Sequence, residues 1–235
     1  LIRDRSINAF ALPGGYLGVH LGLISAVGSA DELASVLAHE LSHVTQRHIA
    51  RMIAQQGRQG PMVIGAMILG MLAATRTPTA SGMSAANAVM VGGQAAAIQS
   101  QLNFSRDMER EADRVGYGVM TEAGYEPQGF VTMFEKLQQA ARLNDNGSFP
   151  YLRSHPMTTE RISDAQARQQ LLPARAAVAT IPTHAMMSAR AQVLAKPGVD
   201  VLRNITALAN ATSLAAQSKS KQAGVLYGAT MAEME

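Results

Sequence analysis

The strongest structural signal in the chain is an amphipathic helix that carries two histidines. Ser29 and Glu32, three residues apart, form a capping-box pattern, and helical periodicity then runs over 31–56. At about 100° per residue, His39 and His43 lie one turn apart on the same side of this helix. The sequence therefore predicts a capped helix with paired imidazoles on one face.

The pentapeptide 39–43, HELSH, has the spacing of a zinc site. Imidazoles at i and i+4 can bind one Zn²⁺, and Glu40, about 100° around the helix, can reach a water molecule that the metal activates. A carboxylate in that place can take the proton of the water and pass it to a leaving amine. The pattern indicates peptide-bond hydrolysis. The alternative is that the two histidines lie one turn apart by chance, on a helix whose role is only to pack in the fold. His48, about 180° from His39, is expected to be a core or surface histidine.

A catalytic zinc ion requires a third protein ligand and one open position. A second helix, predicted over 106–123 with Ser105 as its cap, offers Glu109 and Asp113 one turn apart. Glu111 points about 200° away from Glu109. These acidic residues could instead form a solvated charge run with the arginines beside them. Helical spacing favours Glu109 or Asp113 as the third ligand and does not choose between them.

A β-hairpin is predicted near the start of the chain. Short apolar runs in 6–24 flank the turn signal Pro13-Gly14-Gly15, so we expect two strands near a sheet edge. Because Gly15 and Gly18 leave the backbone open, an extended peptide could add to this edge as another strand. The alternative is an ordinary protected edge.

The remaining chain is predicted to be mostly helical. Residues 59–101 are rich in Gly, Ala, Ser and Met and indicate two apolar helical pieces around the loop 75–82. The part from 62 to 101 is a lid, a membrane- or partner-facing surface, or simple filler. Further helices are predicted over 127–143 and 159–172, with 174–196 ambiguous and a helical pair over 199–235 that separates near 217–221.

Composition excludes several classes of protein. With 47% hydrophobic and 16% charged residues among 235, the chain is too apolar to be disordered. The net charge of +3 comes without a Lys/Arg-rich run, so nucleic acid is not an expected partner. The absence of cysteine suits an oxidising compartment without proving one. The chain begins at Leu1 without a signal-peptide pattern, and we interpret it as processed or truncated.

Four motifs in order are together more specific than the pentapeptide alone. They are NAFALPGG from Asn8, LASVLAHELSHVTQRH, SRDMEREAD and SHP at 154–156. This set resembles metallopeptidase family forty-eight, the gluzincin endopeptidases that include heat-shock protein X and the CAAX prenyl proteases. It is most similar to the periplasmic BepA-like branch, whose protease domain precedes tetratricopeptide repeats, and the resemblance covers 7–168.

The resemblance implies roles for particular residues. The zinc ligands that it implies are His39, His43 and Glu109, and Asp113 is implied as the acceptor that orients a ligand histidine.

The resemblance also implies a late histidine at the site. His155 corresponds to the family residue that occupies the open zinc position or stabilises the oxyanion, and Arg161 is a weaker candidate for substrate contact. Without the resemblance, His155 would be a turn histidine and Arg161 an exposed helix residue.

The expected fold is α+β and mostly helical, with a small sheet beside the active-site helix. A zinc metalloprotease domain is expected over 1–196, lacking part of its N-terminal region, and a truncated TPR-like helical repeat over 197–235. The resemblance implies a periplasmic endopeptidase that binds one Zn²⁺ and cleaves misfolded or unfolded envelope proteins. Contact with a membrane surface is compatible with this expectation. The alternative is a latent protease that serves as a chaperone or scaffold for outer-membrane assembly.

Overall fold

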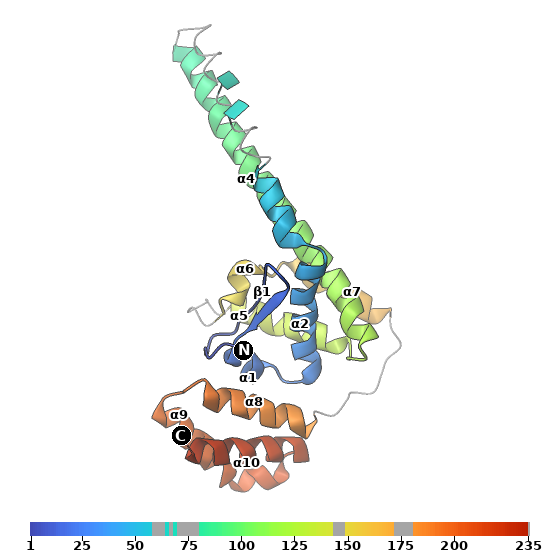
Figure 1. Ribbon diagram of the computed structural model, residues 1–235, viewed down its shortest axis with the longest axis vertical. Coiled ribbons are helices and arrows are strands. Elements are labelled where there is room, and N and C mark those ends of the chain that lie inside the picture. Colours follow the sequence, from blue (N-terminus) through green and yellow to red (C-terminus); the bar gives the residue numbers. More distant parts are fainter. Residues whose placement is uncertain (58–63, 66–67, 70–79, 143–148, 172–180, 235) are drawn as a thin grey trace. The chain divides into compact units, whose positions relative to one another are not determined.

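The computed structural model describes residues 1–57, 64–65, 68–69, 80–142, 149–171 and 181–234 (Figure 1). The chain divides into two compact units, one comprising 1–42 with 112–235 and the other comprising 43–111. The predicted loop at 144–148 and most of the segment 59–79 lie outside the described residues. Helices α2 and α4 each contribute residues to both units.

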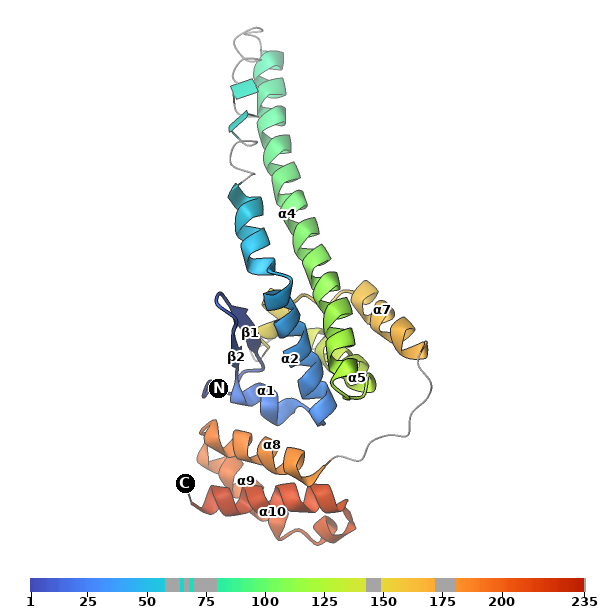
Figure 2. The same ribbon diagram turned by 45° about the vertical axis from the view of Figure 1, so that its right-hand side comes forward.

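The predicted hairpin is present. Strands β1 (Ala9–Leu12) and β2 (Tyr16–Val19) pair antiparallel, and both are edge strands of a two-stranded sheet (Figure 2). Gly14 and Gly15 adopt φ of 91° and 85° in the turn, a backbone conformation that glycine takes without strain. The prediction that the apolar run up to residue 24 belongs to the second strand is wrong. Strand β2 ends at Val19, which pairs with Ala9, the first residue of β1, and helix α1 (Leu21–Ala26) follows.

Helix α2 (Ala30–Thr45) begins as predicted but ends earlier. The Ser29 hydroxyl accepts the Glu32 N–H at 3.1 Å, so the cap forms. The prediction of one helix over 31–56 is wrong, because Arg47 has a φ of 55° and a second helical segment covers 48–57. No glycine or proline marks this break in the sequence.

Helix α4 (Ala80–Glu122) is one continuous helix of 43 residues. Two expectations are therefore wrong: Ser105 lies inside the helix and caps nothing, and residues 80–82 are helical instead of belonging to a loop. No proline interrupts the sequence from 80 to 122, so the backbone hydrogen bonds continue past the polar residues near 105.

The main apolar core lies in the unit that contains the termini. Helices α5 (Gln128–Arg142), α6 (Tyr151–Ser154) and α7 (Thr159–Gln170) contribute to it, and α5 and α7 were predicted. Phe130 and Leu137 of α5 are each 1% exposed. On α2 the buried side is the histidine side, whereas Leu41, on the leucine side, is 40% exposed. The core therefore holds the histidines in place.

The last three α-helices, α8 (Pro182–Leu194), α9 (Val199–Ala209) and α10 (Lys219–Glu233), lie side by side, with α10 packed against both others (Figure 1). A short 3₁₀ helix, η1 (Thr212–Ala216), separates α9 from α10. The predicted helical pair is therefore present, and the ambiguous segment before it forms α8. The domain boundary at 196 and the repeat assignment stay predictions.

The fold class is as expected, mostly helical with one small sheet. Among the described residues, no helix combines the length and the apolar character needed to cross a bilayer.

Candidate metal centre

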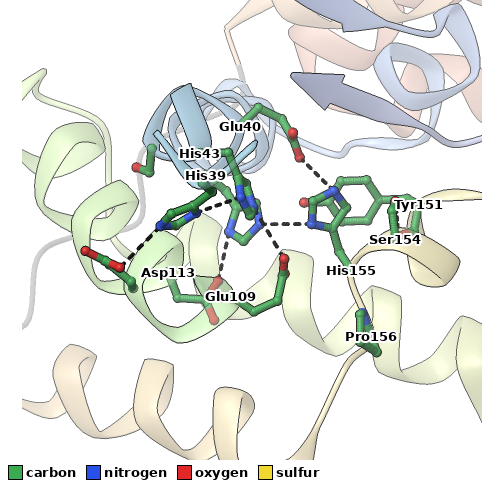
Figure 3. Close-up of polar contacts among 12 residues, drawn as sticks. His39, Glu40, His43, Glu109, Asp113, Tyr151, Ser154, His155 and Pro156 are labelled. Atoms are coloured by element: carbon green, nitrogen blue, oxygen red, sulfur yellow. Dashed lines mark hydrogen bonds and ion pairs between the residues drawn. The ribbon is translucent and has the colours of Figure 1, made fainter. Parts of the chain in front are cut away.

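Helix α2 presents three side chains that can bind a metal ion or accept a proton: His39, Glu40 and His43 (Figure 3). His39 and Glu40 are 2% and 1% exposed, and the side chain of His43 is 12% exposed. The two histidines lie one turn apart, as a regular helix requires. Burial holds the imidazoles in a region of low dielectric, where a charge is stable only beside a partner.

Helix α4 presents Glu109 and Asp113, also one turn apart. Oε1 of Glu109 lies 3.4 Å from Nε2 of His43, and Glu109 is 4% exposed. Oδ1 of Asp113 lies 2.9 Å from Nδ1 of His39. The two carboxylates that helical spacing could not distinguish therefore contact different histidines, and through different ring nitrogens.

Four donor side chains converge. One nitrogen or oxygen atom from each of His39, His43, Glu109 and His155 lies within 4.8 Å of the others. In a tetrahedral zinc site with bonds of 2.0–2.1 Å, neighbouring donor atoms are about 3.3 Å apart. The measured 3.4 Å from His43 to Glu109 and 3.2 Å from His39 Nε2 to His155 Nδ1 match that edge length. The donor set and its spacing fit a metal ion.

Asp113 is itself held by Arg161. The guanidinium donates from Nε to Oδ2 at 2.6 Å and from Nη2 to Oδ1 at 2.8 Å, and Nη1 donates to the Pro156 carbonyl at 2.9 Å. Burial alone would raise the pKa of Asp113, but the hydrogen bonds of Arg161 and His39 outweigh it and hold that pKa below its ordinary value. Asp113 is therefore ionised at neutral pH beside Nδ1 of His39, and its orienting role stays a prediction.

His155 follows the short helix α6, and its ring stacks on Tyr151 with centroids 4.5 Å apart. Its Nδ1 faces His39 Nε2, and its Nε2 lies 3.4 Å from Oε1 of Glu40. In this arrangement His155 is at once a candidate fourth ligand and the partner of Glu40 (Figure 3).

The other predicted site residues have local partners. Arg161 is 3% exposed and fully engaged with Asp113 and Pro156, which favours a supporting role. A Cβ at Gly18 would lie 2.5 Å from the Phe10 ring, and Gly15 serves the turn. Substrate contact by Arg161, Gly15 or Gly18 stays a prediction.

Sequence reasoning missed three residues beside the histidines. His48 is 1% exposed and places Nδ1 at 2.9 Å from Nδ1 of His43. Glu111 contacts His48, and Arg51 contacts Glu111. Burial lowers the pKa of His48 below its ordinary value, although the hydrogen bond to Glu111 opposes this, so the ring is neutral at pH 7. Helical periodicity could not reveal these contacts, because they depend on the break at Arg47.

Comparison with known proteins decides the family. A model described as Peptidase family M48 matches residues 1–169, which include every residue of the centre. The chain belongs to peptidase family M48. The resemblance inferred from the four motifs is thereby confirmed.

Curated relatives in the M48 family carry two kinds of name. The chain is 39% identical over 201 residues to the putative beta-barrel assembly-enhancing protease of Vibrio cholerae serotype O1, covering 85% of this chain and 40% of the relative. It is 38% identical over 168 residues to the beta-barrel assembly-enhancing protease of Escherichia coli K12, covering 72% and 33%. A third, the mitochondrial metalloendopeptidase OMA1 of Schizosaccharomyces pombe, is 32% identical over 166 residues, covering 69% and 43%. The match thus spans less than half the length of these relatives.

Proposed function

We propose that this protein is a zinc-dependent endopeptidase. The observation that carries the proposal is the convergence of His39, His43, Glu109 and His155, whose donor set and spacing fit Zn²⁺. Membership of a peptidase family supports the reaction class.

The residues of the chain have separate tasks in this proposal. Zinc, when bound, acidifies a water molecule and polarises a carbonyl group. His39, His43 and Glu109 hold the ion, and the Glu40 carboxylate takes a proton from the attacking water and delivers it to the leaving amine. His155 must leave its place between His39 and Glu40 before water and substrate enter, and it can then stabilise the oxyanion.

Cleavage of casein by the purified chain tests the proposal. Glu40→Gln should lower the rate by about 10²–10⁴-fold, because the proton acceptor is lost while the metal ligands remain. Glu135→Gln, at an exposed position of α5, is the matched control and should leave the rate unchanged. Chelation should abolish cleavage, and added Zn²⁺ should restore it. Cleavage that survives both chelation and Glu40→Gln would exclude the proposal.

A second candidate function is a latent protease that acts mainly as a chaperone or assembly scaffold. The contact of His155 with both His39 and Glu40 favours it, because those contacts occupy the general base and the position where water would enter. A scaffold without turnover predicts no zinc-dependent cleavage in the wild type or in any variant of the site, whereas a latent protease predicts a gain in His155→Ala.

We further propose that the substrates are misfolded or unassembled proteins of the bacterial envelope, met in the periplasm. The names of the Vibrio and Escherichia relatives, which refer to beta-barrel assembly, support this setting. The edge strands β1 and β2, with Gly15 and Gly18, would bind an extended peptide by backbone hydrogen bonds, which an unfolded segment offers. Helices α8 to α10 are the candidate surface for the outer-membrane assembly machinery. Exposed apolar residues, among them Ile64, Ile68 and Leu69, support contact with a membrane surface.

A further inference from the structure

His48 lies against the side of His43 that faces away from Glu109. The two Nδ1 atoms are 2.9 Å apart, while Nε2 of His43 is directed to Glu109 at 3.4 Å. The ring centroids of the two histidines are 4.8 Å apart and nearly perpendicular, at 78°. His43 therefore uses one nitrogen toward the candidate ligands and the other toward His48.

The contact exists only because the helix breaks. In a continuous helix, a residue five positions after His43 would lie about 140° around the axis from it. Arg47 instead adopts a φ of 55°, which a side chain bearing a Cβ rarely takes, and the chain restarts a helix at His48. Strained backbone of this kind is typical of sites where a side chain must be directed to one place.

The far side of His48 is anchored by an ion pair. Nε2 of His48 lies 3.3 Å from Oε2 of Glu111, and Arg51 donates to the same oxygen at 2.7 Å. The Arg51 guanidinium also lies over the Phe104 ring, 5.8 Å from its centroid. Because the Arg51 guanidinium can only donate, Oε2 of Glu111 is an acceptor in this contact.

One arrangement of hydrogens suits both Glu111 and a metal ion bound at Nε2 of His43. A neutral imidazole has one N–H and one lone pair. Oε2 of Glu111 accepts from Arg51 and lies 3.3 Å from Nε2 of His48, so Nε2 of His48 carries the hydrogen and Nδ1 of His48 has the lone pair. His43 must then donate from Nδ1, which leaves its Nε2 lone pair directed toward Glu109. With the opposite tautomers, the lone pair of His48 Nε2 would face the carboxylate of Glu111, and a hydrogen on His43 Nε2 would exclude a cation. In the first arrangement the His43 Nε2 lone pair faces Glu109, and a cation bound between them removes that repulsion.

We propose that His48 is a positioning residue for His43, and that the Arg51–Glu111 pair, acting through His48, keeps the Nε2 lone pair of His43 ready for a metal ion. Asp113 acts on His39 Nδ1 in the same sense, but directly. The inference rests on the proposed metal centre, since His43 is taken as a ligand. Outer partners of ligand histidines commonly contribute 10–100-fold to metal affinity.

The test measures Zn²⁺ affinity of the full chain by competition with a chromophoric chelator. His48→Phe keeps a ring but removes both nitrogens, and we expect the affinity to fall by about 10–100-fold. His48→Gln should recover part of the loss, because its amide can accept from His43 and donate to Glu111. Glu111→Ala should also lower the Zn²⁺ affinity. His184→Phe is the matched control, since His184 is also buried but contacts the Val27 carbonyl.

A second readout needs no metal. Ring-¹⁵N NMR of the metal-free protein should show a larger fraction of the Nδ1–H tautomer of His43 in the wild type than in His48→Phe and Glu111→Ala. Unchanged affinity and unchanged tautomer in both variants would overturn the inference while leaving the proposed peptidase intact. If no zinc-dependent cleavage is found but the tautomer shifts as expected, the proposed function fails and the positioning role stands. If His48→Phe does not fold, Glu111→Ala and His48→Gln decide by the same two measurements.

Discussion

Nε2 of His39 lies 3.2 Å from Nδ1 of His155, although the two residues are 116 positions apart in the chain. The separation equals the distance between two ligands of one tetrahedral metal ion, about 3.3 Å. Because the other nitrogen of His155 lies beside Glu40, this one side chain contacts both a candidate ligand and the candidate base. Access to the centre therefore depends on where His155 lies.

His155→Ala should raise the rate of casein cleavage. Removing the imidazole takes away the contact of His155 with Glu40 and opens one position, while the three other donors remain. If the closed form makes up 90–99% of the wild type, the gain is about 10–100-fold. Tyr151→Leu, which removes the ring stacked on His155, should give a smaller gain. A loss of activity in His155→Ala would mean that oxyanion stabilisation outweighs blocking.

Gly116→Ala should destabilise the protein. A Cβ at this position would lie 3.0 Å from the carbonyl carbon of Ala38 and from the N atom of His39, both backbone atoms that cannot move without shifting α2. We expect a loss of about 1–3 kcal/mol in the free energy of unfolding, measured with urea. Gly118→Ala is the matched control: nothing lies within 4 Å of its Cβ, so the better helix former should stabilise by about 0.5–1 kcal/mol. Equal effects of the two substitutions would contradict close packing at Gly116.

Arg161→Leu should lower stability and shift acid unfolding. The substitution leaves the Asp113 carboxylate buried without its cation, at a cost of about 3–5 kcal/mol. The folded-state pKa of Asp113 is below the ordinary value of 3.8, so its contribution is present above that pH and is lost as the pH falls through the folded pKa. Without Arg161 that pKa rises, and acid unfolding should begin at a higher pH. Arg203→Leu, in an exposed ion pair with Asp200, should change stability by less than about 0.5 kcal/mol.

Tyr117→Phe should stabilise the protein at alkaline pH. The Tyr117 hydroxyl is buried, and it has no hydrogen-bond partner among the residues that the structure describes. Burial raises the pKa of the phenol above 10.0, so the stability it contributes is complete below pH 10 and is lost as the pH rises through the folded value. Thermal unfolding from pH 8 to 11 should show a smaller decline in Tyr117→Phe. An identical decline in both proteins would contradict this assignment.

Local patterns predicted the elements whose stability is mainly local. The Ser29 cap, the turn at Gly14 and Gly15, and helices α5 and α7 depend on neighbours within a few residues, and all are present. The break at Arg47 was missed because no glycine or proline marks it and the apolar periodicity continues to residue 56. Ser105 was wrongly predicted to be a cap because serine is a common capping residue. Serine also occurs inside long helices, as it does in α4, and local sequence does not distinguish the two places.

The spacing of His39, Glu40 and His43 was set by the sequence, because a helix places residues i and i+4 on one face whatever surrounds it. Helical spacing treats Glu109 and Asp113 alike, and only the family resemblance gave them different roles. The tertiary structure decided that Glu109 lies beside His43 and Asp113 beside His39. The contacts of His155 and His48 likewise required the folded chain. Such contacts depend on how separate segments pack and on the left-handed backbone conformation of Arg47. Neither produces a periodic pattern in the sequence.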